Sequence, residues 1–268
     1  MSDNSKNGQP SSPARIAAVG DLHCKTSSQG AFHDLFARIS QDADVMVLCG
    51  DLTDHGLAEE AHVLVRELST ASAIPAVAVL GNHDFESGKA DEVRKILCDA
   101  GVHLLDGDAT EVRGIGFAGA KGFAGGFGRG TLSAFGEPII KRFVQEAVEE
   151  AMKLEAALLR LRTPHRLAVL HYAPIAATVE GEPREIFPFL GCSRLEEPLN
   201  RYRVNACVHG HAHNGTLEGR TTAGAVVYNV SLPLLRKRFP DRPPFRLISL
   251  GVEDEKNMRI TEAVGSGG

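Results

Sequence analysis

Five short apolar runs of the chain are each followed by side chains of the types that bind metal ions. Aspartate, asparagine and histidine supply oxygen and nitrogen ligands without thiolate, a set that suits manganese, iron or zinc. In chain order, residues 16–19 precede Asp21 and His23, residues 45–49 precede Asp51, residues 77–80 precede Asn82, His83 and Asp84, residues 167–170 precede His171, and residues 206–208 precede His209, His211 and His213. Each cluster alone is typical of a turn, but their shared position after an apolar run indicates one common site.

The number of candidate ligands favours a centre with two metal ions. A structural zinc site is tetrahedral and uses four ligands, and the five clusters offer more than four. Two ions about 3.5–4 Å apart form a clamp that stabilises both the attacking and the leaving oxygen of a phosphoryl displacement. Such a pair needs a carboxylate between its ions, so the residue types point to phosphoester chemistry.

Alternating strands and helices are expected to position these clusters. The apolar runs are continuous, which is typical of strands buried on both faces. Helically spaced apolar stripes lie between them, at residues 32–39, 57–68 and 93–97. This alternation is typical of α/β layers, in which ligands bind beyond the carboxyl ends of the strands. We therefore expect the five clusters to converge at one sheet edge.

The middle and the end of the chain depart from this alternation. Residues 121–136 are rich in glycine and lead into a helix expected at about 137–161, with Pro138 in its first turn. The loop is interpreted either as a lid or rim over a site or as a surface connection. Residues 225–230 and 245–252 are typical of strands with no long helix between them, which suggests an antiparallel portion.

The composition is that of an ordinary globular protein. The chain has 268 residues, of which 43% are hydrophobic and 24% charged, and its formal net charge of -5 argues against nucleic acid as a partner. We expect one domain over 14–263 with disordered tails at 1–13 and 264–268. Five cysteines without a C-x-x-C pair indicate neither a disulfide framework nor a zinc finger. Because no apolar run is long enough to cross a bilayer and no signal-peptide pattern is visible, a cytoplasmic location is expected.

Taken together, the clusters resemble the motifs of the calcineurin-like metallophosphoesterase superfamily. The matching motifs are Asp21-x-His23, Gly50-Asp51, Gly81-Asn82-His83-Asp84, His171 and Gly210-His211-x-His213. The resemblance implies the metallophosphoesterase fold, of α/β (α+β) class, with a central β-sandwich flanked by helices. The glycine-rich loop and long helix near 121–161 would then be an insertion into that fold.

The resemblance also implies a role for each motif residue. One metal ion would be bound by Asp21, His23 and His213, the other by Asn82, His171 and His211, with Asp51 bridging the two. The cofactors would be two ions of manganese, iron or zinc, and a hydroxide bound to them would attack phosphorus in line. His83 would contact the phosphate and protonate the leaving oxygen, while Asp84 would hold the His83 ring and favour its protonated form. Further candidates for substrate contact are Arg129, His55 and His209.

Departures from the family pattern narrow the range of expected substrates. The protein Ser/Thr phosphatases of the superfamily carry an arginine after the second motif and another after the third, where this chain has Asp54-His55-Gly56 and Asp84-Phe85-Glu86. The stretch 50–56 is more similar to the bacterial phosphodiesterase-like branch. We therefore predict a phosphodiesterase acting on a small phosphorylated substrate, with a phosphomonoesterase for a metabolite or nucleotide as the alternative. A non-catalytic metal-binding scaffold is disfavoured because no ligand is lost, and nothing in the pattern indicates an oligomeric state.

Overall fold

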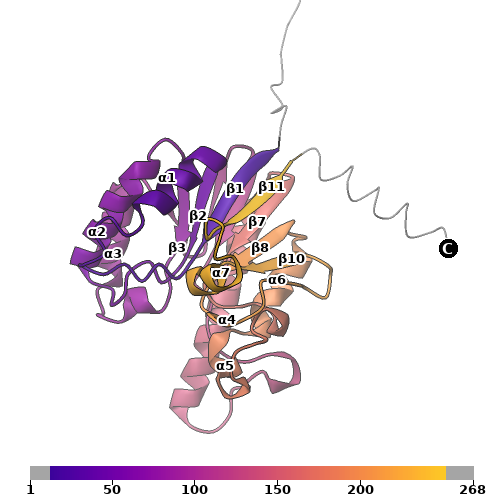
Figure 1. The fold of residues 1–268 in the computed structure, drawn as a ribbon. Coiled ribbons are helices and arrows are strands. Elements are labelled where there is room, and N and C mark those ends of the chain that lie inside the picture. Colours follow the sequence, from indigo (N-terminus) through magenta and orange to yellow (C-terminus); the bar gives the residue numbers. More distant parts are fainter. Residues whose placement is uncertain (1–12, 252–268) are drawn as a thin grey trace, which may run out of the picture.

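Two mixed β-sheets lie face to face, with helices against their outer sides (Figure 1). The computed structural model describes residues 13–251. Apart from Pro13, the tails expected at 1–13 and 264–268 lie outside the described residues, and the domain boundaries at 14 and 263 stay predictions.

The first sheet has five strands in the order β11-β1-β2-β3-β4. Their bounds are Ala14–Val19 for β1, Val45–Cys49 for β2, Ala76–Val79 for β3, His103–Leu104 for β4 and Arg246–Leu250 for β11. Strands β1 to β4 are parallel, whereas β11 runs antiparallel to β1. Three helices connect the parallel strands: α1 (His33–Asp42), α2 (Ala58–Leu68) and α3 (Ala90–Asp99). They bury apolar stripes, such as Leu35, Phe36 and Ile39 of α1, against this sheet.

The second sheet has six strands in the order β5-β6-β7-β8-β10-β9. Their bounds are Asp108–Val112 for β5, Ile115–Gly119 for β6, His165–Val169 for β7, Ala206–His209 for β8, Glu218–Arg220 for β9 and Val226–Asn229 for β10. The four inner strands are parallel and the two edge strands antiparallel. The remaining helices are α4 (Pro138–Arg160), α5 (Phe187–Leu190), α6 (Glu196–Arg201) and α7 (Leu232–Arg238).

Strand β7 shows why the apolar runs are continuous. Leu167 and Val169 belong to the core between the two sheets, whereas Ala168 and Leu170 pack in a second core that contains Leu158 of α4. Both faces of the strand are therefore buried, and the two cores leave no polar face to interrupt the run.

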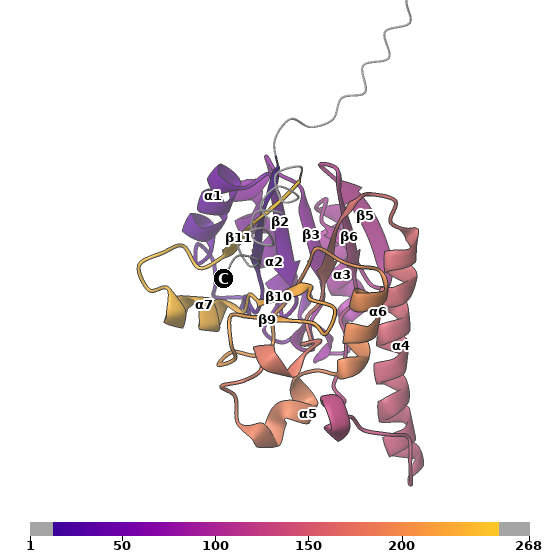
Figure 2. The same cartoon turned by 90° about the vertical axis from the view of Figure 1, so that its right-hand side faces the viewer.

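Within residues 13–251 a strand or helix forms in each segment where one was expected, and the structure adds the strands β4, β5, β6 and β9 and the short helices α5, α6 and α7. Strands β5 and β6 form a hairpin whose two turn residues, Arg113 and Gly114, have φ of 54° and 77°. The expected helix at 137–161 is α4, which connects the parallel strands β6 and β7 and packs against the outer face of the second sheet. Figure 2 shows α4 along one side of the molecule, extending beyond the sheets.

Candidate metal centre

The predicted metal ligands converge from both sheets. Asp21, His23, Asp51 and Asn82 follow strands of the first sheet, and His171, His211 and His213 follow strands of the second. The sheets meet at this edge, where the N–H of Gly20 donates to the carbonyl of Val230 at 2.9 Å. In both sheets the candidate ligands therefore lie beyond the carboxyl ends of the strands, and the seven side chains lie at one edge of the sandwich.

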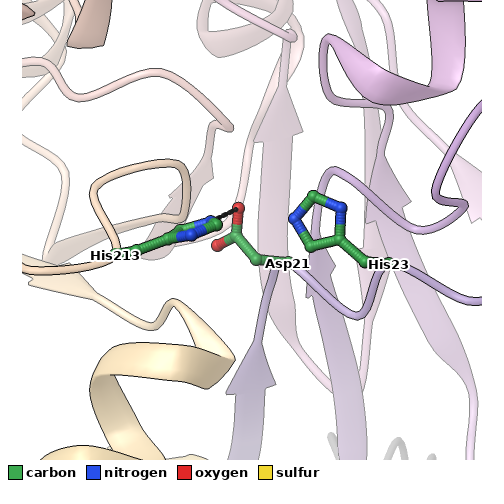
Figure 3. A group of neighbouring side chains, drawn as sticks. All are labelled: Asp21, His23 and His213. Carbon is green, nitrogen blue, oxygen red and sulfur yellow. Dashed lines mark hydrogen bonds and ion pairs between the residues drawn. The ribbon is translucent and has the colours of Figure 1, made fainter.

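A first group consists of Asp21, His23 and His213, whose ligand atoms lie within 4.8 Å of one another. Figure 3 shows the two imidazole rings on either side of the Asp21 carboxylate. Asp21 Oδ1 lies 3.2 Å from His213 Nε2, and both carboxylate oxygens accept from the N–H of His211 at 3.0 Å. Burial alone would raise the pKa of Asp21, but the bond to His213 and the nearby histidines lower it to about 2. The group therefore contains a charged carboxylate at neutral pH.

A second group consists of Asp51, His171 and His211. His171 Nδ1 lies 3.0 Å from the carbonyl oxygen of Cys49. Because a carbonyl only accepts, Nδ1 carries the proton, and in the neutral ring the lone pair of Nε2 is free. Nε2 lies 2.9 Å from the amide oxygen of Asn82 and 3.3 Å from Asp51 Oδ1. Three electron-rich atoms face one another, as a cation between them would require.

The carboxylate of Asp51 faces both groups. Its Oδ2 lies 3.8 Å from His23 Nε2, and its Oδ1 faces His171 on the other side. His23 Nε2 is buried and has no hydrogen-bond partner. An unpaired buried nitrogen is costly, so this atom fits a ligand position beside a bridging carboxylate.

The backbone at the site is strained. Asp21, His23, Asp51 and His211 have φ of 57°, 46°, 47° and 68°, and among the described non-glycine residues only Arg113 and Arg203 share this left-handed region. Each such residue costs about 1–2 kcal/mol, and such strain clusters at functional sites. Two motif glycines allow the close approach. A Cβ on Gly81 would overlap Asp51, and one on Gly210 would overlap the carboxylate of Asp21.

One ring nitrogen of His83 is hydrogen-bonded to the backbone, and the other faces the candidate metal centre. Nδ1 lies 2.7 Å from the backbone carbonyl of Asp54 and must donate to it, whereas Nε2 lies 4.0 Å from Asp51 Oδ2. Burial lowers the pKa of His83, but the Asp54 carbonyl and the charges of Asp51, Glu86 and Asp54 outweigh it, and the net pKa is raised. The geometry favours a ring that holds its second proton on Nε2, facing the centre.

The structure does not place Asp84 against the His83 ring. The fully buried carboxylate accepts instead from the N–H groups of Leu52, Thr53 and Gly81 and from the Thr53 hydroxyl. The expectation that Asp84 holds His83 is therefore wrong, because these hydrogen bonds join the loops after β2 and β3. The carbonyl of Asp54 holds the ring in its place.

The three candidates for substrate contact have different surroundings. His55 is exposed at the rim, with Nε2 3.2 Å from Asp54 and Nδ1 3.3 Å from Glu86. His209 is fully buried, and its ring nitrogens lie 2.7 Å from the Gly210 carbonyl and 2.8 Å from the Thr178 hydroxyl, so substrate contact is excluded there. Arg129 is exposed on the glycine-rich loop and makes no hydrogen bond or ion pair within residues 13–251.

Sequence reasoning did not single out Lys121 or Glu86. Lys121 follows β6 as the ligands follow their strands, but the glycine-containing β6 was not predicted. Glu86, 3.6 Å from His83 Nδ1, lies beyond the recognised motif. A strand prediction for residues 115–119 would have placed Lys121 at the same edge.

Comparisons with known proteins agree with this geometry. A family model for calcineurin-like phosphoesterases matches residues 14–215. The chain belongs to the calcineurin-like phosphoesterase family. This membership confirms the predicted fold class and identifies a metal-dependent phosphoesterase, a hydrolase of phosphoester bonds. Calcineurin-like phosphoesterases depend on a dinuclear metal centre, and the two groups at this sheet edge are placed to hold metal ions.

Solved structures share the calcineurin-like phosphoesterase fold at low sequence identity. Phosphopantetheinyl hydrolase from Mycobacterium tuberculosis superposes with a TM-score of 0.64 at 14% identity, over 90% of this chain and 98% of that chain. TT1561 of Thermus thermophilus gives a TM-score of 0.51 at 15% identity, over 89% and 99% of the two chains. No curated protein gives a significant sequence match. Among the described helices, none is long and apolar enough to cross a membrane.

Proposed function

We propose that the chain hydrolyses phosphodiesters of small molecules with two metal ions held at this sheet edge. One ion would be held by Asp21, His23 and His213, the other by Asn82, His171 and His211, with Asp51 between them. The observation that carries the proposal is the position of Asp51, whose two oxygens face His23 on one side and His171 on the other. When bound, the ions would offset charge on the phosphoryl oxygens and acidify a water.

The residues of the chain would orient the ligand-bearing loops and the His83 ring and would supply a proton to the leaving oxygen. Asp84 fixes the loops that carry Asp51 and Asn82, and the Asp54 carbonyl fixes the His83 ring. His83 would then deliver the proton on Nε2 to the leaving oxygen, so that a poor alkoxide leaving group departs as an alcohol. The raised pKa of His83 keeps more of that proton in place near neutral pH.

Two carboxylates beside histidines of the candidate site support a diester over a monoester. Asp54 Oδ1 lies 3.5 Å from His23 Nδ1, and Glu86 Oε2 lies 3.6 Å from His83 Nδ1. A phosphodiester carries one negative charge, whereas a monoester carries up to two near neutral pH, and like charges nearby disfavour the second. The arginines that would offset a dianion in the protein phosphatases are absent at 55 and 85–88.

The test compares bis(4-nitrophenyl) phosphate with 4-nitrophenyl phosphate, using protein reconstituted with Mn²⁺ and Asp51→Asn as the blank. Faster cleavage of the diester is the expected result. Faster cleavage of the monoester would contradict the diester preference and favour the monoesterase alternative. Turnover that Asp51→Asn retains in full would contradict the metal-ligand assignment. Metal analysis of the same samples would identify the bound element and show whether two ions bind per chain.

A further inference from the structure

Lys121 lies at the edge where the candidate ligands gather. It follows β6, which is the parallel neighbour of the His171 strand β7. The Lys121 carbonyl accepts from the N–H groups of His171 and Tyr172 at 3.0 and 3.1 Å. Across the sandwich, Gly119 packs against Val79 at the end of β3, the strand that leads to Asn82. Lys121 therefore lies between the segments that carry Asn82 and His171.

Three aromatic rings surround its ammonium. Nζ lies 4.9 Å from the ring centroid of Phe123, 5.4 Å from that of Tyr172 and 5.6 Å from that of Phe85. The Tyr172 ring contacts that of His211, with centroids 4.5 Å apart. Phe85 directly follows His83 and Asp84 and is 41% exposed. Two of the three rings therefore belong to residues that adjoin the candidate site, because Tyr172 contacts the proposed ligand His211 and Phe85 lies two residues after the proposed proton donor His83.

The charge of Lys121 has no ion-pair partner within residues 13–251. Its hydrogen bond is to the neighbouring Gly122 carbonyl, at 2.9 Å. Burial lowers the pKa of Lys121, and the negative charge of Glu150 opposes that shift only in part. Glu150 is engaged elsewhere, because Oε1 binds Lys153 at 2.7 Å and Oε2 accepts from the Gly122 N–H at 2.8 Å. An ammonium has three donors, and a largely desolvated charge is costly without a partner. An anion within reach of Nζ would use the remaining donors.

We propose that Lys121 binds a charged oxygen of the phosphate group under attack, on the side formed by Asn82, His171 and His211, and so sets the affinity for substrate phosphate. The proposal deepens the proposed function and rests on it for the identity of the anion. The arginine positions of the protein phosphatases are vacant in this sequence, and Lys121 reaches the same edge from a different strand.

Lys121→Met removes the charge and keeps an apolar stem among the three rings. The matched control is Lys95→Met, on α3, where the ammonium pairs with Asp99. Binding of inorganic phosphate to the metal-loaded proteins is measured by titration calorimetry, with metal content determined on the same samples. We expect Lys121→Met to weaken phosphate binding about 10-fold or more, as the loss of a charge-assisted hydrogen bond implies. Metal content should be unchanged, and Lys95→Met should match the wild type in both measurements.

Two further readouts separate substrate binding from a structural role. KM for bis(4-nitrophenyl) phosphate should rise in Lys121→Met with a smaller change in kcat, and Lys121→Arg should restore part of the phosphate affinity. Equal phosphate affinity in wild type and Lys121→Met would overturn the proposal. Loss of metal together with phosphate binding, in both Lys121→Met and Lys121→Gln, would also overturn it, because Lys121 would then build the site. Absence of ester hydrolysis by the wild type would contradict the proposed function, while the phosphate titration would still decide the role of Lys121.

Discussion

The carboxylate of Asp84 accepts hydrogen bonds from both the backbone N–H and the hydroxyl of Thr53, at 2.8 and 2.6 Å. It also accepts from Leu52 at 3.2 Å and from Gly81 at 2.8 Å. Asp51 directly precedes Leu52, and Asn82 directly follows Gly81. One buried carboxylate therefore fixes the separation of two proposed ligands on neighbouring strands.

Asp84→Asn should weaken this connection. The amide group would present N–H₂ toward backbone donors and leave at least one of them unpaired, which costs about 1–3 kcal/mol. We expect the free energy of unfolding to fall by about that amount and metal affinity to fall with it, as measured by urea unfolding and metal titration. The acid limb of the pH–rate profile should not move. A shifted limb with unchanged metal affinity would instead support a direct effect of Asp84 on His83.

Gly210→Ala should disrupt the first ligand group. The new Cβ would overlap Oδ2 of Asp21, so the carboxylate would have to leave the position in which its Oδ1 lies 3.2 Å from His213. We expect a loss of at least 10-fold in metal affinity, with little change in the far-ultraviolet circular dichroism. The control is Gly130→Ala, where an added Cβ would meet no atom within 4 Å and φ is not left-handed. Normal metal binding by Gly210→Ala would show that Asp21 is not held as a ligand at this position.

Glu86→Gln should change the substrate preference. Removing one negative charge near His83 should raise kcat/KM for 4-nitrophenyl phosphate more than for bis(4-nitrophenyl) phosphate, by a few-fold because Glu86 is exposed. The difference should shrink as salt is added. Glu59→Gln, at the exposed start of α2, is the control. An unchanged ratio of the two kcat/KM values would show that Glu86 does not contribute to a preference for diesters.

His209 should make stability depend on pH. Burial lowers the pKa of His209 from 6.5 to about 4, so the unfolded chain binds more protons than the folded one between those values. Stability should therefore rise with pH from about 4 to 6.5, and the part of this rise that is due to His209 should be on the order of 3 kcal/mol between the two ends of the window. His209→Gln should flatten that slope, measured by urea unfolding of chelator-treated protein. Exposed His62→Gln should retain it, and an equal slope in His209→Gln would contradict the assignment.

The parallel strands and the position of the site were predictable because their signals are local. An apolar run followed by Asp, Asn or His marks both the strand and its functional end, as at Val45–Cys49 and Asp51. The hairpin β5–β6 was not predictable, because Asp108–Val112 is mostly polar and Ile115–Gly119 contains two glycines. Lys121 was missed together with β6.

The surroundings of individual side chains were harder to predict. His209 and His211 are two residues apart in one motif, yet the first is fully buried and the second is only partly buried, because Ala206–His209 continues as a strand for one residue more than its apolar run indicates. Asp84 adjoins His83 in sequence, but its carboxylate turns toward Thr53. Adjacency in the chain does not specify which hydrogen bonds a carboxylate will accept when several buried N–H groups lie nearby.

The proposed bridging carboxylate and the nearest imidazole come from different sheets. Asp51 extends from the first sheet and His171 from the second, and their side chains lie 3.3 Å apart beyond the core that residues of β2 and β7 both line. The width of this core therefore helps to determine the distance between the two side chains. Enlarging Val47 or Val169 would push the sheets apart and widen the gap without touching a ligand. We therefore expect the size of the proposed metal pair to constrain the volume of the interior.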